Sequence, residues 1–419
     1  MSTAPISRQG PGIRPSRWYG FAATSLVFFF LNLATFTSLG VVLYTMVAEL
    51  HWSMTAAGFS FSLLGIACGV SSPLAPLVMR WTDGRITICI GTALLVIGFC
   101  LAAIASGLLV FYAAMIFLGV GYSLAGNVPS IYLIGGWFRR GSSSVIGLYL
   151  MLGALGAAFG PPIVDAIVNG SGGWRGHWRL MAVAAGLIGV VCLAWIREPA
   201  PAEPDDTGDE TSTVKPRAQP QWNPRQAVLT RQFLLVAAAM AATMACVTTN
   251  SSVTVSHLVK LGATPSGAAF VLSAIAITAT AVKGIAGRLC EKVAPPLLLS
   301  AGLVLQALGC LILAVASTPF LQYGSAIVFG TGWGLAYVSA TVVLLEYFGV
   351  ATGSKILSIV WLLTTVAAAG PMLAGMIADR YGTFGPIFDL YAGMLLIIAV
   401  PIFMMREPAE QPSLSPAAG

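Results

Sequence analysis

Gly119-Val-Gly-Tyr-Ser-Leu-Ala125 and Gly330-Thr-Gly-Trp-Gly-Leu-Ala336 are two copies of one pattern, and 211 residues separate them (330 − 119). Each copy is followed by an apolar stretch and then by an aromatic pair, Trp137-Phe138 after the first and Tyr347-Phe348 after the second. A repeat at this distance predicts that the chain consists of two related halves. Both copies lie within long apolar stretches, which decide the class of fold.

The composition is that of a membrane protein. Of the 419 residues, 57% are hydrophobic and 9% are charged, whereas soluble domains carry about 25% charged residues. The apolar runs are continuous and do not alternate with polar residues, and a helix needs about 20 such residues to cross a bilayer. Because only helices or closed barrels satisfy their backbone in lipid, we expect an all-α membrane protein.

Twelve transmembrane helices are expected, arranged as two pseudo-symmetric six-helix bundles. We expect residues 1–197 to form the N-terminal bundle, 198–228 a cytoplasmic linker, 229–405 the C-terminal bundle and 406–419 a cytoplasmic tail. The linker is rich in Pro, Asp and Glu and cannot bury a core. The predicted spans are 18–48, 55–79, 86–106, 109–135, 144–168, 177–197, 229–256, 266–288, 296–316, 320–345, 355–378 and 384–405.

The basic residues predict the orientation. If the N-terminus is inside, the cytoplasmic side receives 16 Lys and Arg residues and the outer side receives 4, as the positive-inside rule requires. We therefore expect a multi-pass protein of the cytoplasmic membrane with both termini in the cytoplasm. No stretch of basic residues interleaved with aromatic ones lies outside the loops, so the lipid bilayer, and not nucleic acid, is the expected large partner. The oligomeric state stays open, and a monomer is plausible.

No enzyme chemistry is predicted. The seven cysteines lie mostly within apolar stretches without paired spacing, so we interpret them as small buried hydrophobic residues and expect no metal site. The sequence contains no phosphate-binding loop and no Ser/His/Asp order in a strand–turn–helix context. We expect no cofactor and no ATP-driven step.

Several short motifs resemble one family. Gly40-Val-Val-Leu-Tyr44 followed by Glu49-Leu-His-Trp-Ser53, Trp137-Phe138-Arg-Arg-Gly141 and Gly173-Trp-Arg175 are similar to segments of the major facilitator superfamily. They resemble most its monocarboxylate transporter branch and the related oxalate/formate antiporter-like proteins. The resemblance implies the twelve-helix fold of that superfamily and secondary transport of a carboxylate.

Lys283 is the most informative candidate. It lies deep in the predicted span 266–288, where a cation costs about 2.5–3.5 kcal/mol and normally faces a cavity and a counter-charge. No acidic residue is obviously placed at the same depth, so an anionic substrate is the natural partner. The alternative is that Lys283 extends to the cytoplasmic surface. The resemblance implies that this position binds the substrate carboxylate.

The size of the substrate's charge follows from the span 355–378, which has no cation beyond its first residue, Lys355. One cation favours a monocarboxylate, although hydroxyl and amide donors could hold a second carboxylate. Asn127 is the next candidate for substrate contact, and the resemblance places such a contact near it. Gly126 precedes it and Pro129 follows it, and we expect these two residues to weaken the local helix. Weaker candidates are polar or aromatic residues of other spans, for which helix packing is the alternative: Asn32, Tyr44, Asn250, Tyr337 and Trp361.

Proton coupling and gating have their own candidates. His257, Lys283 and Asp389 are the candidates for proton coupling, and His257 has an unperturbed pKa near 6.5. The resemblance implies that loops on the cytoplasmic side latch the helices during switching, with Asp83 and Arg85 in the first half. Glu291 and Lys292 are their counterparts in the second half. The alternative is that these loop residues are ordinary positive-inside anchors.

These observations predict a proton-coupled symporter of a small organic monocarboxylate that works by alternating access. One alternative is an antiporter or exporter of a larger or aromatic acid, because Tyr44, Trp333, Tyr337 and Trp361 could line a wide apolar cavity. A transporter-fold sensor is a second alternative, and it predicts saturable binding without flux.

Overall fold

The computed structural model describes residues 17–138, 142–170, 172–199, 222–349, 352, 356–357, 359–360 and 363–408. Within these residues every regular element is a helix, so the predicted all-α class is confirmed. Trp361, Lys355, Arg139 and Arg140 lie outside the described residues, as does most of the predicted linker.

The described part of the first half contains six apolar spans in chain order. Its helices are α1 (Arg17–Asn32), η1 (Leu33–Thr37), α2 (Ser38–Leu50), α3 (Met54–Ser71), α4 (Leu74–Trp81), α5 (Gly84–Ile104), α6 (Leu108–Ala125), α7 (Asn127–Trp137), α8 (Ser142–Gly170) and α9 (Gly173–Trp195). The π-helix η1 joins α1 and α2 into one span of 34 residues.

The second half repeats this order after a short helix in the linker. Its elements are α10 (Pro224–Ala227), α11 (Arg231–Lys260), α12 (Pro265–Cys290), α13 (Pro295–Ala314), α14 (Pro319–Phe348), η2 (Thr364–Ala369), α16 (Gly370–Tyr381) and α17 (Gly385–Phe403). Eleven helical segments of the described chain are long and apolar enough to cross a bilayer. The remaining predicted span, 355–378, is represented in the described part mainly by η2 and α16.

Two predicted spans are interrupted. The span 55–79 divides at Ser72 and Pro73 into α3 and α4, because the proline ring clashes with the preceding turn of a helix. The span 109–135 divides at Gly126, where the backbone leaves the helical region with φ −82° and ψ −138°. The second break agrees with the prediction that Gly126 and Pro129 weaken this helix.

Local sequence signals explain the helix ends. Hydroxyl or carboxylate side chains cap five helix N-termini by accepting a backbone N–H, as expected for such residues; they are Ser53, Asp83, Thr230, Thr264 and Thr318. The α16 helix ends at Gly382, which has φ 74° and so adopts the left-handed conformation of many helix C-termini.

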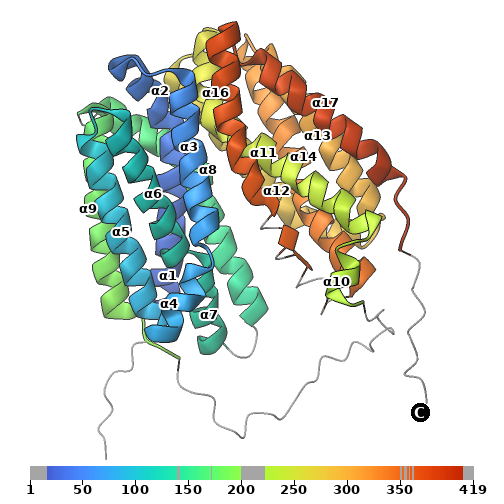
Figure 1. The fold of residues 1–419 in the computed structure, drawn as a ribbon, viewed down its shortest axis with the longest axis horizontal. Helices are drawn as coiled ribbons and strands as arrows, with labels where there is room; N and C mark the ends of the chain where they lie inside the picture. The colour runs from blue at the N-terminus through green and yellow to red at the C-terminus, as the bar shows by residue number, and fades with distance from the viewer. Residues whose placement is uncertain are drawn as a thin grey trace, which may run out of the picture.

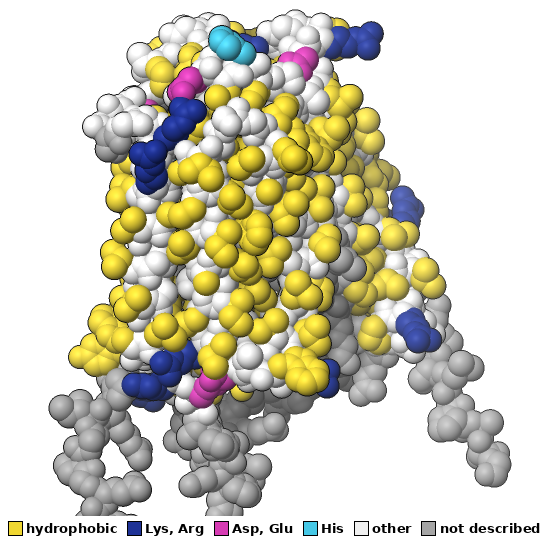
Figure 2. Space-filling view, turned by 60° about the vertical axis from the view of Figure 1, so that its left-hand side comes forward, with side chains coloured by type: hydrophobic (Ala, Val, Ile, Leu, Met, Phe, Trp, Pro, Cys, Tyr) yellow, Lys and Arg dark blue, Asp and Glu magenta, His cyan; other side chains and the backbone are white. Residues whose placement is uncertain are grey.

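The two halves lie side by side. Figure 1 shows α1–α9 on the left and α11–α17 on the right, with the start of α1, α10 and the end of α17 at the lower end. We call this end the linker end and the opposite end the far end. Figure 2 shows a hydrophobic surface across the middle of one face, with charged side chains gathered near both ends. This distribution suits a protein that spans a bilayer.

The halves meet mainly along two pairs of helices, with a smaller contact between α2 and α11. The α3 helix packs along α16, and α8 packs along α12. Glycines allow close approach in the first pair: a Cβ built on Gly58 would lie 2.1 Å from the Pro371 carbonyl oxygen, and one on Gly375 would lie 2.2 Å from that of Met54. Small residues at contacting helix faces are typical of packing in membranes.

Candidate functional site

Lys283 projects from α12 toward two aromatic rings of α14. Its Nζ atom lies 4.3 Å from the ring centroid of Trp333 and 4.5 Å from that of Tyr337. Trp333 and Tyr337 are four residues apart and therefore occupy one face of α14. Both distances fall within the range of cation–π attraction. Among the described residues no acidic side chain forms an ion pair with Lys283.

Trp333 also lines a small cavity between the halves. The cavity has a volume of about 70 Å³, and its walls come from η1 and α8 in the first half and from α11, α12 and α14 in the second. The lining residues are Thr37, Ala157, Pro161, Val247, Asn250, Ser251, Leu272, Ile275, Ala276, Phe329 and Trp333. Lys283 is not a lining residue in this conformation, but it is seven residues, or two helical turns, beyond Ala276 on the same face of α12.

Two N–H donors of this cavity wall lack partners. Asn250 Nδ2 and Trp333 Nε1 are buried and make no hydrogen bond, whereas Asn250 Oδ1 accepts a hydrogen bond from the Thr254 hydroxyl. An unpaired buried donor costs about 1–3 kcal/mol, and such a group in a native structure calls for an explanation. A ligand with acceptor atoms would satisfy both donors.

The structure brings together only part of the predicted substrate site. Tyr337 contacts Lys283, and Asn250 lines the cavity beside Trp333. Asn127 is exposed and accepts a hydrogen bond from the Tyr149 hydroxyl at 3.3 Å. Asn32 is half-buried at the start of η1, and its amide donates to the Phe28 carbonyl at 2.8 Å.

Tyr44 makes no described contact with this site. Tyr44 is half-buried and packs against the main apolar core. Trp361 lies outside the described residues. The substrate-contact role of the whole set stays a prediction.

The three residues predicted to couple protons lie on three different helices and do not form one site. His257 is buried in α11, where its Nε2 lies 2.9 Å from the Leu313 carbonyl oxygen and its ring packs against Phe384 and Phe388. Asp389 is an exposed residue of α17. Only Lys283 of the three contacts a residue of the cavity wall.

The predicted gating residues of the first half hold that half together at the linker end. The Asp83 carboxylate caps α5 by accepting the Ile86 N–H at 2.6 Å. The Arg85 guanidinium donates to the Leu193 carbonyl of α9, and its backbone N–H donates to the Glu198 carboxylate at 3.0 Å. Glu291 and Lys292 are exposed at the end of α12. The gating role itself stays a prediction.

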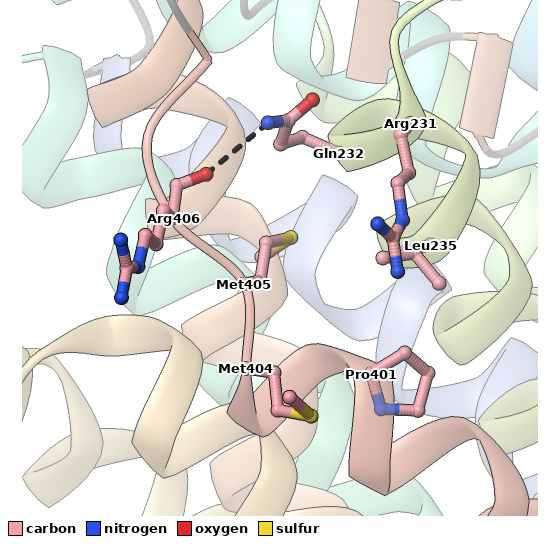
Figure 3. Close-up of a pocket in the computed structure, with 7 residues that line it drawn as sticks. All are labelled: Arg231, Gln232, Leu235, Pro401, Met404, Met405 and Arg406. Carbon is pink, nitrogen blue, oxygen red and sulfur yellow. Dashed lines mark hydrogen bonds between the residues drawn. The ribbon is translucent and has the colours of Figure 1, made fainter.

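A larger hollow lies outside the interface of the halves. It has a volume of about 290 Å³ at the linker end, between the start of α11 and the end of α17. Figure 3 shows Arg231, Gln232 and Leu235 of α11 across from Met405 and Arg406, with Met404 and Pro401 below them. None of the predicted site residues lines it, so the small cavity between the halves is the better candidate for a transport site.

Sequence reasoning missed two features. Asp379 was not a candidate, because the predicted span ends at Ala378, yet its carboxylate joins α16 to the first residues of α3. Trp333 entered only as the wall of a wide cavity, and no sequence signal placed its ring beside Lys283. The spacing of Trp333 and Tyr337 on one helix face was the available hint.

Comparisons with known proteins agree with this fold. The sequence model of the Major Facilitator Superfamily matches residues 25–366 and 240–419. The uncharacterized transporter YycB of Bacillus subtilis (strain 168) is 30% identical over 178 residues, which is 41% of this chain. This match spans 42% of the length of that relative.

Solved transporter structures share the architecture at low sequence identity. A variant of the nucleoside transporter NupG has a TM-score of 0.76 with 14% identity, covering 92% of this chain and 99% of that one. The peptide transporter POT in complex with sulfate has a TM-score of 0.73 with 15% identity, covering 92% and 94%. A bacterial homolog of the human lysosomal transporter Spinster, inward-facing and unoccupied, has a TM-score of 0.72 with 16% identity, covering 94% and 95%. The chain therefore belongs to the Major Facilitator Superfamily and is a membrane transporter of that type.

Proposed function

We propose that this protein is a secondary active transporter of a small organic monocarboxylate, that it works by alternating access, and that it couples the acid to a proton in symport. We place it in the cytoplasmic membrane with the linker end in the cytoplasm, because 16 of its Lys and Arg residues belong to that side and 4 to the other. The far end then faces outward.

The placement of Lys283 carries the proposal. The Lys283 amine, within the membrane segment, meets two aromatic faces and no carboxylate among the described residues. Ring quadrupoles compensate a cation only partly, by about 0.5–2 kcal/mol. An anion that enters between the halves would complete the compensation, and one cation matches one carboxylate.

The cavity supports a small substrate with acceptor atoms. Its volume of about 70 Å³ has room for a few atoms or water molecules in this conformation. The unpaired donors of Asn250 and Trp333 would orient oxygen atoms of the substrate. Because Trp333 touches both the cavity and the lysine amine, a carboxylate bound in the cavity would need only a small movement of the long Lys283 side chain.

The coupling of the acid to a proton follows from the free-energy cost of moving a charge through the membrane. A protonated lysine paired with an anion is neutral overall and can pass through the switch. The empty site returns without moving a buried cation only after the lysine has released its proton. Of the three predicted coupling residues, Lys283 is the one that contacts the cavity wall, which supports it as the group that gains or loses the proton. In this mechanism acid and proton leave together on the cytoplasmic side.

The test is uptake of a panel of radiolabelled monocarboxylates into proteoliposomes, with and without an inward proton gradient. Wild type and Lys283→Ala are compared at equal amounts of reconstituted protein. Uptake that the gradient stimulates and that Lys283→Ala abolishes is the expected result. Uptake of an acid that survives the substitution unchanged would show that the carboxylate binds elsewhere.

The aromatic faces beside Lys283 favour one second candidate, export or exchange of a larger aromatic acid. A ring stacked on Trp333 or Tyr337 would use the same amine for its carboxylate. This candidate predicts that uptake requires an internal counter-substrate and does not respond to the proton gradient. Preloading the liposomes with each acid of the panel separates the two functions.

A further inference from the structure

The far end of the molecule is held shut by hydrogen bonds between the halves. The Asp379 carboxylate of α16 accepts the backbone N–H of Met54 at 2.9 Å and that of Thr55 at 2.8 Å. It also accepts the Thr55 hydroxyl at 2.6 Å. These three bonds attach the second half to the N-terminus of α3, where free N–H groups and the helix dipole favour a negative charge.

A second acidic residue makes a related contact, but here the acid belongs to the first half and the helix start to the second. Asp165 belongs to α8 in the first half, and its carboxylate accepts the Ser266 hydroxyl of α12 in the second half at 2.5 Å. Ser266 is the second residue of α12, as Thr55 is of α3. The two residues are 211 apart in the sequence (266 − 55), which is the spacing of the repeat.

The surroundings of the two contacts match as well. Ser53 caps α3 and Thr264 caps α12, each accepting the N–H three residues later. Part of the difference between the contacts has a local cause: Pro265, at the position equivalent to Met54, has no N–H to donate. The cationic side chains near Asp379 are Lys260, which donates to the Gly382 carbonyl, and Arg380 beside it in the chain.

The position of these contacts within the molecule gives them a role. A further hydrogen bond between the halves joins the Ser62 hydroxyl of α3 to the Met372 N–H at 3.1 Å. These hydrogen bonds all lie in the part of the molecule between the far end and about the middle of α3. Breaking them is therefore a condition for opening the far end.

We propose that Asp379 and Asp165 form a two-fold pair of latches, each an acidic residue on one half bonded to a helix start on the other, and that the pair sets the equilibrium between the two access states. The latches act as positioning residues and do not touch the substrate. The inference rests on alternating access in the proposed function, but it needs no knowledge of the transported acid. Any change that removes the bonds favours the state open at the far end.

Distances between spin labels at the far end test this directly. Ser106 and Ser317 are equivalent exposed positions, 211 residues apart (317 − 106), in the far-end loops of the two halves. Labels carried on unnatural amino acids at these sites leave the seven native cysteines untouched. The full chain is measured by pulsed electron resonance in detergent without substrate, as wild type, Asp379→Ala, Asp165→Ala and the double variant.

The expected result is a longer-distance population that grows at least about threefold in Asp379→Ala and further in the double variant, because each latch stabilises the closed state only. Thr55→Val removes one of the three Asp379 bonds without removing the carboxylate, and it gives a smaller shift in the same direction. This milder variant covers the case in which the double variant does not fold.

Glu49→Gln is the matched control. Glu49 is also an acidic residue at the far end, but it pairs with Arg175 and Trp174 of its own half, so its loss leaves the distances unchanged. An unchanged distance distribution in Asp379→Ala and Thr55→Val would overturn the proposal, as would an equal shift in Glu49→Gln. Because no substrate is present, this failure is distinct from a wrong assignment of the acid.

Discussion

The two copies of the repeat pack in the same way but carry different chemistry. A Cβ on Gly91 would lie 2.5 Å from the Ala125 nitrogen, and one on Gly302, 211 residues later, would lie 2.7 Å from the Ala336 nitrogen. Glycines seven residues, or two turns, further on repeat the match, with Gly98 against Leu118 and Gly309 against Phe329. Close helix packing therefore accounts for the shared residues of the motif.

The differences between the copies fall on the site. The positions equivalent to Lys283, Trp333 and Tyr337 in the first half are Ser72, Tyr122 and Gly126. Ser72 lies in the turn that ends α3, and Gly126 is the break between α6 and α7, whereas α14 continues unbroken through Tyr337. Both halves therefore share the same helix packing, but only the second half carries the charge that we assign to substrate binding.

The largest effect is expected from moving the charge. Lys283→Ala should reduce transport by at least about 30-fold, since truncating one partner of a buried charge pair costs about 2–5 kcal/mol. Lys283→Arg should retain part of the activity. Adding Ser72→Lys to Lys283→Ser should not restore uptake, because that position has no pair of rings beside it. Restored uptake in proteoliposomes would show that the halves are interchangeable.

The next effect concerns the scaffold. Gly91→Ala and Gly302→Ala each place a methyl group against backbone atoms, so each should lower stability by about 1–3 kcal/mol. We expect similar drops in the midpoint of thermal unfolding in detergent for both variants. Gly324→Ala in α14 is the control, because nothing lies within 4 Å of its added Cβ. A drop in only one half would contradict the matched packing.

A smaller effect is expected at the aromatic pair equivalent between the copies. Trp333→Phe keeps a ring beside Lys283 but removes the unpaired N–H, so KM for the transported acid should rise about 2- to 10-fold. Tyr122→Phe in the first half should change KM by less than about twofold. Initial uptake rates over a range of substrate concentrations measure both. Equal effects would place the substrate between the two aromatic residues.

The smallest effect is expected for Tyr337→Phe. The ring that faces the Lys283 amine is retained, so the cation–π contact persists and transport should change by less than about threefold. Tyr337→Ala removes the ring and should reduce uptake more than Tyr337→Phe does. The reverse order would mean that the hydroxyl matters more than the ring.

The sequence predicted the fold because the bilayer imposes long apolar helices that can be recognised one at a time. It also predicted the weak point at Gly126, since glycine and proline act locally. The break at Ser72 was missed although Pro73 signals it, because the apolar run continues into α4. Local signals are readable, but they compete with the hydrophobic pattern.

The site was only partly predictable, because contacts between helices depend on how each helix is rotated. Lys283 was identified by its cost in a membrane, which is a local property. Its pairing with Trp333, the exposure of Asn127 and the contact of Asp379 with α3 each require the relative placement of distant segments. No property of the single residues carries that information.

The central claim is that an anion binds at Lys283, and equilibrium binding to the purified protein tests it without any need for flux. An acid that wild type transports is titrated as a radiolabelled ligand against wild type, Lys283→Ala and Ser72→Ala in detergent. The account predicts a loss of affinity of at least about 30-fold in Lys283→Ala and an unchanged affinity in Ser72→Ala. Wild-type affinity in Lys283→Ala would contradict it.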